Sequence, residues 1–280
     1  MSDSELVEEQ VKDGIPNSLA HYHSFRPSEV QEAIWAQKFI LFVENLSVSF
    51  DGFKAVDIPC FGIEHGELRV IIGPNGAGKT TFCDLVSGKT PPTTGSVFYD
   101  GRNITKMDES DIALMGIGRK FQTPTVFDSL TTYENLLLAL PGAQDWKNNL
   151  WTRESAEERA QIESILHKVN LMEYRDLEAK SLSHGKRQWL AISALIVSKP
   201  KLLLVDEPAA GLTDMETEQT ADLLLELAKE HTLGGIEHDM DFVRRLNQKV
   251  TVLNEGKVLA EGSLEEMEEN DEVMEAYLGR

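Results

Sequence analysis

One stretch decides the fold: Gly73-Pro74-Asn75-Gly76-Ala77-Gly78-Lys79-Thr80, which stands between the apolar run Val70-Ile71-Ile72 and the segment Thr81-Phe82-Cys83-Asp84-Leu85-Val86. The pattern predicts a strand, a glycine loop and a helix. Glycines in the turn let backbone N–H groups surround a phosphate, and the helix adds its positive end. Lys79 can reach the terminal phosphates, and Thr80 can bind Mg²⁺. The complete spacing argues against a glycine-rich turn with a chance lysine, so we predict a nucleoside triphosphate site.

The composition excludes some classes of partner. The chain has 280 residues, 41% of them apolar, which is enough for a substantial core in one large domain or two small ones. Its formal net charge of −20 argues against binding DNA or RNA, because such binding depends on Lys and Arg displacing counterions. We attribute the charge to solubility.

Cysteine content and hydropathy indicate the compartment. Cys60 and Cys83 are too few for a disulfide framework, which is consistent with a reducing cytoplasm. The start, Met1-Ser2-Asp3-Ser4-Glu5, has no basic or apolar signal, and no run approaches the ~18 apolar residues of a membrane helix. We therefore expect a cytoplasmic protein that meets a membrane only through another subunit.

The first part of the chain, residues 1–38, reads as an N-terminal extension, polar and acidic at first and partly disordered. Ser28-Glu29-Val30-Gln31 forms a capping box that predicts a short helix. His21 and His23 have no carboxylate or cysteine at ligand spacing, so we interpret them as solvated side chains rather than a metal site.

From Phe39 onward the hydrophobic pattern is regular. Strands are predicted at residues 41–50, 55–61, 94–101, 117–122, 202–205, 232–236, 250–253 and 258–260, and helices at 134–140, 154–169 and 186–197. The later apolar runs do not alternate, which favours strands buried on both faces of a parallel sheet. The helical block between them reads as an insert.

Two carboxylates, Asp206 and Glu207, follow the apolar run Leu202-Leu203-Leu204-Val205. Beside a triphosphate site, Asp206 can hold Mg²⁺ through water, and Glu207 can orient or deprotonate the water that attacks the γ-phosphate. A helix-capping acid pair is the alternative.

A third motif, Leu182-Ser183-His184-Gly185-Lys186-Arg187-Gln188, precedes a predicted helix. Ser183 is a suitable N-cap, but Lys186 and Arg187 have the sign least suited to the positive end of a helix. Either an external anion offsets this mismatch, or the two basic side chains are simply exposed.

These motifs, with Gln122 and with Glu237-His238-Asp239, occur in the order of an ATP-binding cassette (ABC) transporter ATPase, which the chain resembles from Phe39 to Arg280. The resemblance implies an α/β fold: a P-loop NTPase with a RecA-like mixed β core, an antiparallel β subdomain and an α-helical subdomain inserted at about residues 125–198. Gly118-Arg119-Lys120-Phe121-Gln122 and the segment from Asp206 to Leu212 resemble the branched-chain amino acid importer group, as does the C-terminus, Ala276 to Arg280. Ser183-His184-Gly185 followed by Gln188-Trp189-Leu190 is most similar to the ATP-binding subunit of urea importers.

The resemblance also implies roles for single residues. Phe50 would stack on adenine, Gln122 would sense the γ-phosphate and Mg²⁺, and His238 would contact the γ-phosphate. Ser183 and Gly185 would cap an ATP molecule held by a second ATPase subunit. The nucleotide-binding set is then Phe50, Gly73, Pro74, Asn75, Gly76, Ala77, Gly78, Lys79, Thr80, Thr81, Ser183 and Gly185; the catalytic set is Glu207, His238 and Gln122; and the Mg²⁺ set is Thr80, Gln122 and Asp206. Phe50 is alternatively a core residue.

The sequence departs from the family pattern in three segments. His184 and Lys186 stand where the family has glycine and glutamine. Thr213 replaces a common aspartate, and Thr213-Asp214-Met215-Glu216 forms a capping box that explains it. Gly234-Gly235 interrupts the strand before His238 and predicts a bulge or close backbone contact. These departures bear on turnover more than on nucleotide binding.

The resemblance therefore implies an ATPase that uses ATP and Mg²⁺ to power import of urea or a related small amide, at the inner face of the cell membrane. Expected partners are transmembrane permease subunits, a second ATPase subunit (the same chain or a related one) and, indirectly, a solute-binding protein. The alternatives are a branched-chain amino acid importer, an exporter of the lipopolysaccharide type, and a regulatory nucleotide-binding subunit with little turnover.

Overall fold

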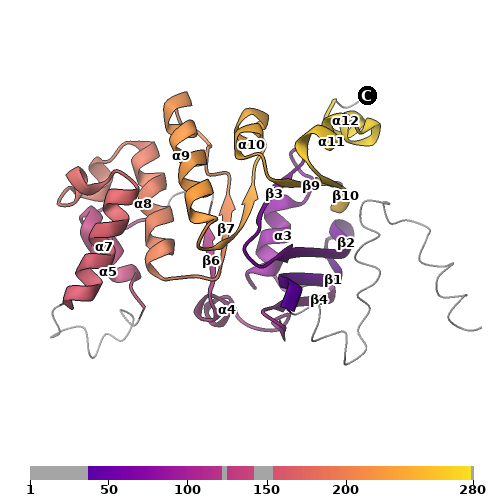
Figure 1. Cartoon of the computed structure of the whole chain (residues 1–280). Helices are drawn as coiled ribbons and strands as arrows, with labels where there is room; N and C mark the ends of the chain where they lie inside the picture. The colour runs from indigo at the N-terminus through magenta and orange to yellow at the C-terminus, as the bar shows by residue number, and fades with distance from the viewer. Residues whose placement is uncertain (1–36, 122–124, 142–153, 279–280) are drawn as a thin grey trace, which may run out of the picture. The chain divides into compact units, whose positions relative to one another are not determined.

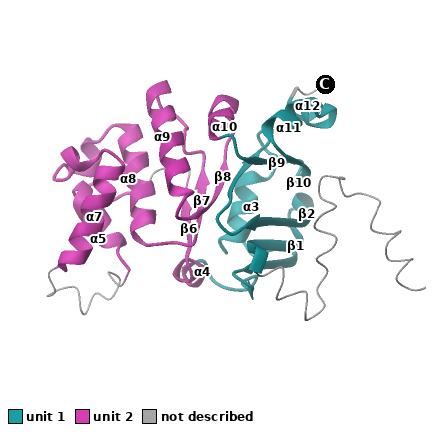
Figure 2. Cartoon of the chain, in the orientation of Figure 1, with its two compact units in different colours: residues 1–109, 247–280 teal, residues 110–246 magenta. Residues whose placement is uncertain are grey.

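The computed structural model describes residues 37–121, 125–141 and 154–278. These residues form two compact units, which Figure 2 colours separately. Of the described residues, unit 1 comprises those up to Glu109 and from Asn247 onward, and unit 2 comprises those from Ser110 to Leu246. The predicted helix and capping box near Ser28, like His21 and His23, lie outside the described residues.

Unit 1 contains the antiparallel sheet that the resemblance implied. Its strands lie in the order β2-β1-β4-β5, and β1 pairs antiparallel with both β2 and β4. A second group of strands in the same unit lies in the order β10-β9-β3. The elements of unit 1, shown in Figure 1, are β1 (Phe39–Phe50), β2 (Phe53–Glu64), β3 (Leu68–Ile72), α3 (Lys79–Val86), β4 (Thr94–Tyr99), β5 (Arg102–Asn103), β9 (Lys249–Asn254), β10 (Lys257–Gly262), α11 (Leu264–Glu268) and α12 (Asp271–Leu278).

Strand direction in unit 1 partly differs from the prediction. β3 and β9 are parallel, as the buried apolar runs indicated. β10 is antiparallel to β9, because only Glu255 and Gly256 separate the two strands and so short a link makes a hairpin. Both residues have positive φ angles, 47° and 77°, which suit such a turn. The expectation of a uniformly parallel sheet is therefore wrong at β10, and the mixed core is correct.

Unit 2 combines three parallel strands with helices. Its strands lie in the order β8-β7-β6, and every residue of β7 and β8 is buried. Helices α5, α7 and α8 pack together within the segment predicted to be helical (Figure 1). The elements of unit 2 are α4 (Glu109–Met115, whose first residue belongs to unit 1), β6 (Ile117–Lys120), α5 (Thr132–Ala139), α7 (Ala156–Lys168), the 3-10 turns η2 (Met172–Tyr174) and η3 (Ala179–Ser181), α8 (His184–Val197), β7 (Leu202–Asp206), α9 (Asp214–Leu227), β8 (Thr232–Ile236) and α10 (Met240–Leu246).

Helix starts follow the capping chemistry of the sequence. Thr131, Ser155, Thr213 and Ser263 each begin a helix with a complete capping box. The box at Thr213 confirms the structural reason proposed for that residue. In the part of the chain that the structure describes, no helix is both long and apolar enough to cross a membrane.

Candidate functional site

The phosphate loop of unit 1, residues 73–80, joins β3 to α3 and packs closely against other backbone segments. A Cβ atom on Gly73 would lie 2.2 Å from the Leu253 carbonyl oxygen of β9. A Cβ atom on Gly78 would lie 2.6 Å from the Ala55 carbonyl oxygen of β2, and Gly78 also has a φ of 96°. Only glycine fits at these two positions without displacing backbone.

Main-chain hydrogen bonds fix the rest of the phosphate loop. Ala77 N donates to Pro74 O at 3.1 Å, which closes a turn inside the loop. Ala77 O accepts from Gly256 N at 3.0 Å, and Gly256 O accepts from Asp57 N at 2.7 Å. The loop is therefore tied to the β9–β10 turn and, through that turn, to β2.

Lys79 is the first residue of α3, and its side chain lies within the loop. It is 7% exposed, and its Nζ donates to Gly73 O at 2.6 Å and to Pro74 O at 3.1 Å. The first turn of α3 has no acidic residue that would offset the positive end of the helix. Thr80 is exposed and Thr81 half-buried in the same turn. The loop thus presents a cation, backbone N–H groups and hydroxyls, the groups that bind a phosphate chain.

Two aromatic residues stand at the turn between β1 and β2. Phe50 is 49% exposed, so it is not the core residue that the alternative proposed. Phe53 pairs with Phe50 across the hairpin and is 67% exposed. The sequence interpretation missed Phe53, although its place directly after the Asp51-Gly52 turn was a signal that it shares this end of the hairpin.

The C-terminal helix of unit 1 also reaches the phosphate loop. Burial raises the pKa of the Tyr277 hydroxyl of α12, and the Gly73 backbone N–H opposes that rise. The terminal segment was noted only as a family resemblance, with no hint that it borders the loop.

The acidic pair of unit 2 lies at the end of β7. Asp206 is 3% exposed, and Glu207 has a φ of 45°, a left-handed conformation that turns the chain sharply. Glu207 N donates to Ile236 O at 3.0 Å, so the exits of β7 and β8 are connected. The capping alternative is wrong, because the helix that follows begins at Asp214 with Thr213 as its N-cap.

Two basic residues of β6 accompany Asp206. Arg119 Nη2 lies 3.7 Å from Asp206 Oδ2, and its guanidinium stacks 4.8 Å from the Phe121 ring centroid. Lys120 is 2% exposed and donates from Nζ to Asp206 O at 3.3 Å. Burial lowers the pKa of Lys120 to about 8, and Asp206, Glu237 and Glu207 oppose that change. Nothing in the sequence pattern indicates that a cation is buried here.

His238 lies beside Glu207. Its Nδ1 is 3.5 Å from Glu207 Oε1, and its side chain is 53% exposed. Within unit 2 the structure therefore brings together two residues of the predicted catalytic set. Gln122, the third, lies outside the described residues.

The third motif begins α8. Ser183 is the N-cap and accepts a hydrogen bond from Lys186 N at 3.4 Å, as predicted. A Cβ atom on Gly185 would lie 2.3 Å from Glu216 Oε1, so glycine allows the starts of α8 and α9 to approach. Hydrogen bonds from Thr213 lower the pKa of that Glu216 carboxyl. His184 Nε2 lies 3.2 Å from Ala210 O, within hydrogen-bond distance of the segment that follows Glu207.

Lys186 and Arg187 have partners inside unit 2. Arg187 Nη2 lies 2.6 Å from Asp128 Oδ1, and Lys186 Nζ is 4.7 Å from the centroid of the Tyr174 ring. Both residues are half-buried. The two basic side chains are therefore not simply exposed, and the external anion stays a prediction.

The paired glycines of β8 do not disturb the strand. β8 follows β7 residue by residue from Thr232 to Ile236 without a shift in register. A Cβ atom on Gly235 would meet no described atom within 4 Å. The predicted bulge is therefore wrong in the pairing with β7, and the predicted close contact is wrong at Gly235.

Metal ligands are sparse in the described segments of the chain. No group of three or more His, Cys, Asp or Glu side chains there could hold a metal ion.

Comparison with known proteins identifies the class. A family model described as ABC transporter matches residues 57–210. The high-affinity branched-chain amino acid transport ATP-binding protein LivG of Salmonella typhimurium is 36% identical over 251 residues, covering 86% of this chain and 98% of that protein. BraF of Pseudomonas aeruginosa, a protein of the same description, is 36% identical with the same coverage. The ADP conformation of MJ1267, an ATP-binding cassette of an ABC transporter, matches with a TM-score of 0.75 at 29% identity, covering 86% of this chain and 99% of that one.

The chain therefore belongs to the ABC transporter family. It has the fold of an ABC ATPase and is an ATP-hydrolysing subunit of that family.

Proposed function

We propose that this ATPase powers import of urea or a related small amide. The observation that carries the proposal is the segment Ser183-His184-Gly185 with Gln188-Trp189-Leu190, which resembles the corresponding segment of urea importers. His184 is built into its surroundings: it lies within reach of Ala210 O, and Gln188 Nε2 is 3.5 Å from its ring. His184 is exposed, and these contacts place its ring at the surface beside the segment that follows Glu207.

Branched-chain amino acids are the second candidate solute. The relatives LivG and BraF are described as transporting them, and each matches most of this chain. Because the ATPase does not touch the solute, the described residues favour neither solute through contact chemistry.

The proposed roles in ATP hydrolysis belong to residues of the phosphate loop and to residues that follow β7 and β8. The phosphate loop and Lys79 bind the triphosphate, and Phe50 stacks on the base. Bound Mg²⁺, held by Thr80, by Asp206 through water and by Gln122, would neutralise charge on the phosphates. Glu207 orients and deprotonates the attacking water, and His238 contacts the γ-phosphate. Each role is a proposal for the named side chain.

A second ATPase subunit completes the chemistry. Ser183 and Gly185 lie at the positive end of α8, where N–H groups suit an anion. In the proposed dimer, formed with the same chain or a related one, they cap the ATP held by the partner. Closure of that dimer and its reopening after hydrolysis would drive the permease cycle.

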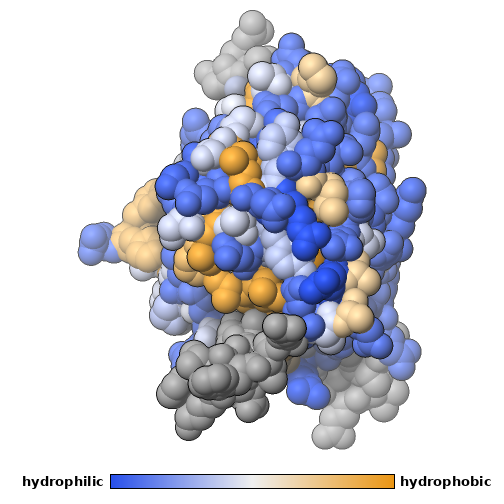
Figure 3. Space-filling model, turned by 90° about the vertical axis from the view of Figure 1, so that its left-hand side faces the viewer, coloured by the Kyte–Doolittle hydropathy of each residue, from blue (hydrophilic) through white to orange (hydrophobic). Residues whose placement is uncertain are grey.

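The helical side of unit 2 is the proposed contact for the permease subunits. Figure 3 shows apolar side chains gathered there within a largely hydrophilic surface. The large exposed apolar residues of this segment include Phe127, Leu138 and Leu177, at 62%, 48% and 40% exposure. Apolar residues in such numbers suit a protein interface, which would place this ATPase at the inner face of the membrane.

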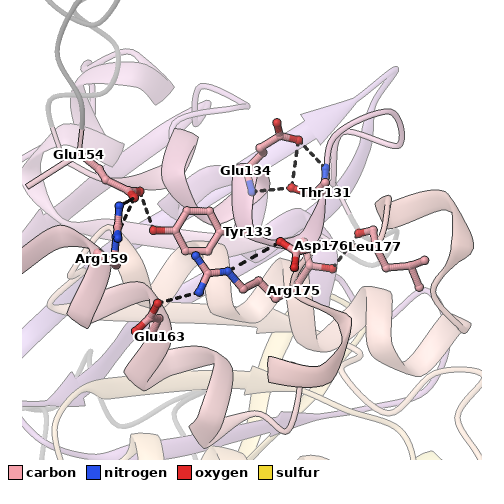
Figure 4. Close-up of polar contacts among 10 residues, drawn as sticks. Thr131, Tyr133, Glu134, Glu154, Arg159, Glu163, Arg175, Asp176 and Leu177 are labelled. Atoms are coloured by element: carbon pink, nitrogen blue, oxygen red, sulfur yellow. Dashed lines mark hydrogen bonds and ion pairs between the residues drawn. The ribbon is translucent and has the colours of Figure 1, made fainter. Parts of the chain in front are cut away.

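Polar contacts hold this helical region together (Figure 4). Tyr133 of α5 donates to Glu154 Oε2 at 2.5 Å, and Arg159 of α7 donates to Glu154 Oε1. Arg175 donates to Glu163 Oε1 at 2.7 Å and stacks 4.3 Å from the Tyr133 ring centroid. A region braced in this way can transmit movement as one body.

The test is to purify the full chain from its source with its partners and to identify what copurifies. We expect permease subunits and a solute-binding protein that binds radiolabelled urea, and urea should stimulate ATP hydrolysis in reconstituted membranes. Stimulation by leucine and not by urea would replace the first candidate with the second. Recovery of lipid-exporting subunits would point to export, and the absence of steady-state phosphate release would favour a regulatory subunit.

A further inference from the structure

Glu237 is a buried carboxylate to which the sequence assigned no role of its own. It follows β8 directly, precedes His238 and is 0% exposed. A carboxylate in such a place is costly unless its oxygens receive hydrogen bonds. Its contacts therefore indicate why it is there.

Both oxygens of Glu237 accept main-chain hydrogen bonds. Ala209 N donates to Oε1 at 3.1 Å, and His238 N donates to Oε2 at 3.2 Å. Ala209 lies two residues beyond Glu207. One side chain thus joins the segment that carries Glu207 to the residue His238, whose ring faces Glu207 at 3.5 Å.

The charged surroundings make this link sensitive to protonation. Burial raises the pKa of Glu237 to about 7, while the N–H groups of Ala209, His238 and Asp239 and the charge of His238 oppose the rise. Lys120 faces it from β6, Asp206 and Glu207 are the charged groups at the end of β7, and His238 and Asp239 follow β8. Protonation would turn one oxygen from an acceptor into a donor and so weaken one of the two connections.

We propose that Glu237 is a positioning residue for ATP hydrolysis, which holds the Glu207 segment and His238 in register through the N–H groups of Ala209 and His238. The inference rests on the proposed roles of Glu207 and His238. A glutamine at position 237 keeps the size of the side chain but has one accepting oxygen, and its NH₂ group would face a backbone N–H. An aspartate keeps the charge but is too short to reach both segments.

The experiment compares wild type, Glu237→Gln and Glu237→Asp as full chains, measuring ATP affinity with a fluorescent nucleotide, kcat from pH 6 to 9, and melting temperature. Small misplacements at a reacting centre cost about 10- to 100-fold in rate. We expect both variants to lose about that much kcat, with ATP affinity changed less than about threefold. The wild-type kcat should fall as pH drops through about 7, and that fall should be absent in Glu237→Gln.

Two results would overturn the inference. One is a Glu237→Gln protein with wild-type kcat and pH profile. The other is a loss of kcat that is accompanied, in both variants, by a similar fold-loss of ATP affinity and by a lower melting temperature. That combination would indicate general destabilisation of the protein. Glu207→Gln is assayed in parallel. If this variant still hydrolyses ATP, the proposed role of Glu207 is wrong. If Glu207→Gln is inactive and Glu237→Gln has wild-type activity, only the proposed role of Glu237 is wrong.

Discussion

The phosphate loop of unit 1 and the carboxylate segments of unit 2 (residues 206–209 and 237–239) hold their shapes by different means. The loop depends on backbone packing, with Gly73 against Leu253 and Ala77 tied to Gly256. The carboxylate segments depend on buried side chains, with Glu237 and Lys120 bonded to main-chain groups. Backbone packing of this kind leaves a glycine pattern in the sequence, but buried side-chain bonding does not.

The strongest challenge to this comparison comes from buried charge in unit 1 itself. Arg69 of β3 is 0% exposed and lies 2.6 Å from oxygens of both Glu67 and Glu261. Thr251 joins the same cluster, accepting from Arg69 Nη1 at 2.9 Å and donating to Glu261 Oε1 at 2.8 Å. Unit 1 therefore also uses side-chain bonding, directly before its glycine loop.

We expect Arg69→Met to have the largest effect on stability. It leaves the Glu261 carboxylate buried without its main cation, which costs about 3–5 kcal/mol of the free energy of unfolding. Chemical denaturation of the full chain measures this loss. The double variant Arg69→Met/Glu261→Leu should recover a large part of it, because the fully buried carboxylate is then gone and Glu67, at 15% side-chain exposure, keeps access to water. A single variant that loses less than about 1 kcal/mol would show that the cluster contributes little.

The next prediction tests the backbone packing of the loop. Gly73→Ala places a methyl group against the Leu253 carbonyl and should cost about 3 kcal/mol, at the upper end for overpacking. ATP affinity should fall with it, because the loop must move.

Gly76→Ala is the matched control for that prediction. Its Cβ would meet no described atom within 4 Å, and only its φ of 84° opposes the change. Its cost should be about 1–2 kcal/mol. Equal ATP affinities for the two variants, measured by fluorescent nucleotide titration, would contradict the argument from close packing.

The smallest expected effect lies in the helical region of unit 2. Tyr133→Phe removes the hydroxyl bonded to Glu154 and should cost about 1 kcal/mol at neutral pH. The bond lowers the pKa of Glu154, so its contribution is present above the ordinary pKa of that carboxyl and is lost as pH falls through the lowered value. The difference from wild type, followed by thermal melts, should therefore shrink in acid. Tyr174→Phe is the control, because the Tyr174 ring carries its contact with Lys186.

The sequence predicted the features that are marked by a repeating hydrophobic pattern, by a local motif or by a helix cap. The strand, loop and helix around Lys79 are confirmed, as are the helices of unit 2 and the Thr213 capping box. It predicted a bulge at Gly234-Gly235, where the strand pairs regularly with β7, because strand propensity depends on the context that the fold supplies.

Buried polar contacts escaped the sequence interpretation. Charged residues are usually exposed, and nothing in the sequence marks Arg69, Lys120 and Glu237 as exceptions. Their burial depends on which segments the fold brings together. Their partners lie far along the chain: Glu261 is 192 residues from Arg69, and Asp206 is 86 from Lys120. No local pattern encodes such pairs.

Glu207→Gln in the full chain tests the central claim most directly, namely that the loop binds the nucleotide and the carboxylate segments perform the chemistry. Glutamine keeps the shape of the side chain but cannot accept a proton from water, and general-base catalysis is worth about 10²- to 10⁴-fold in rate. We predict that ATP affinity is retained, steady-state phosphate release falls by at least about 100-fold, and an ATP-bound dimer accumulates. Undiminished hydrolysis would contradict the claim, and loss of ATP binding would show that the two functions are not separate.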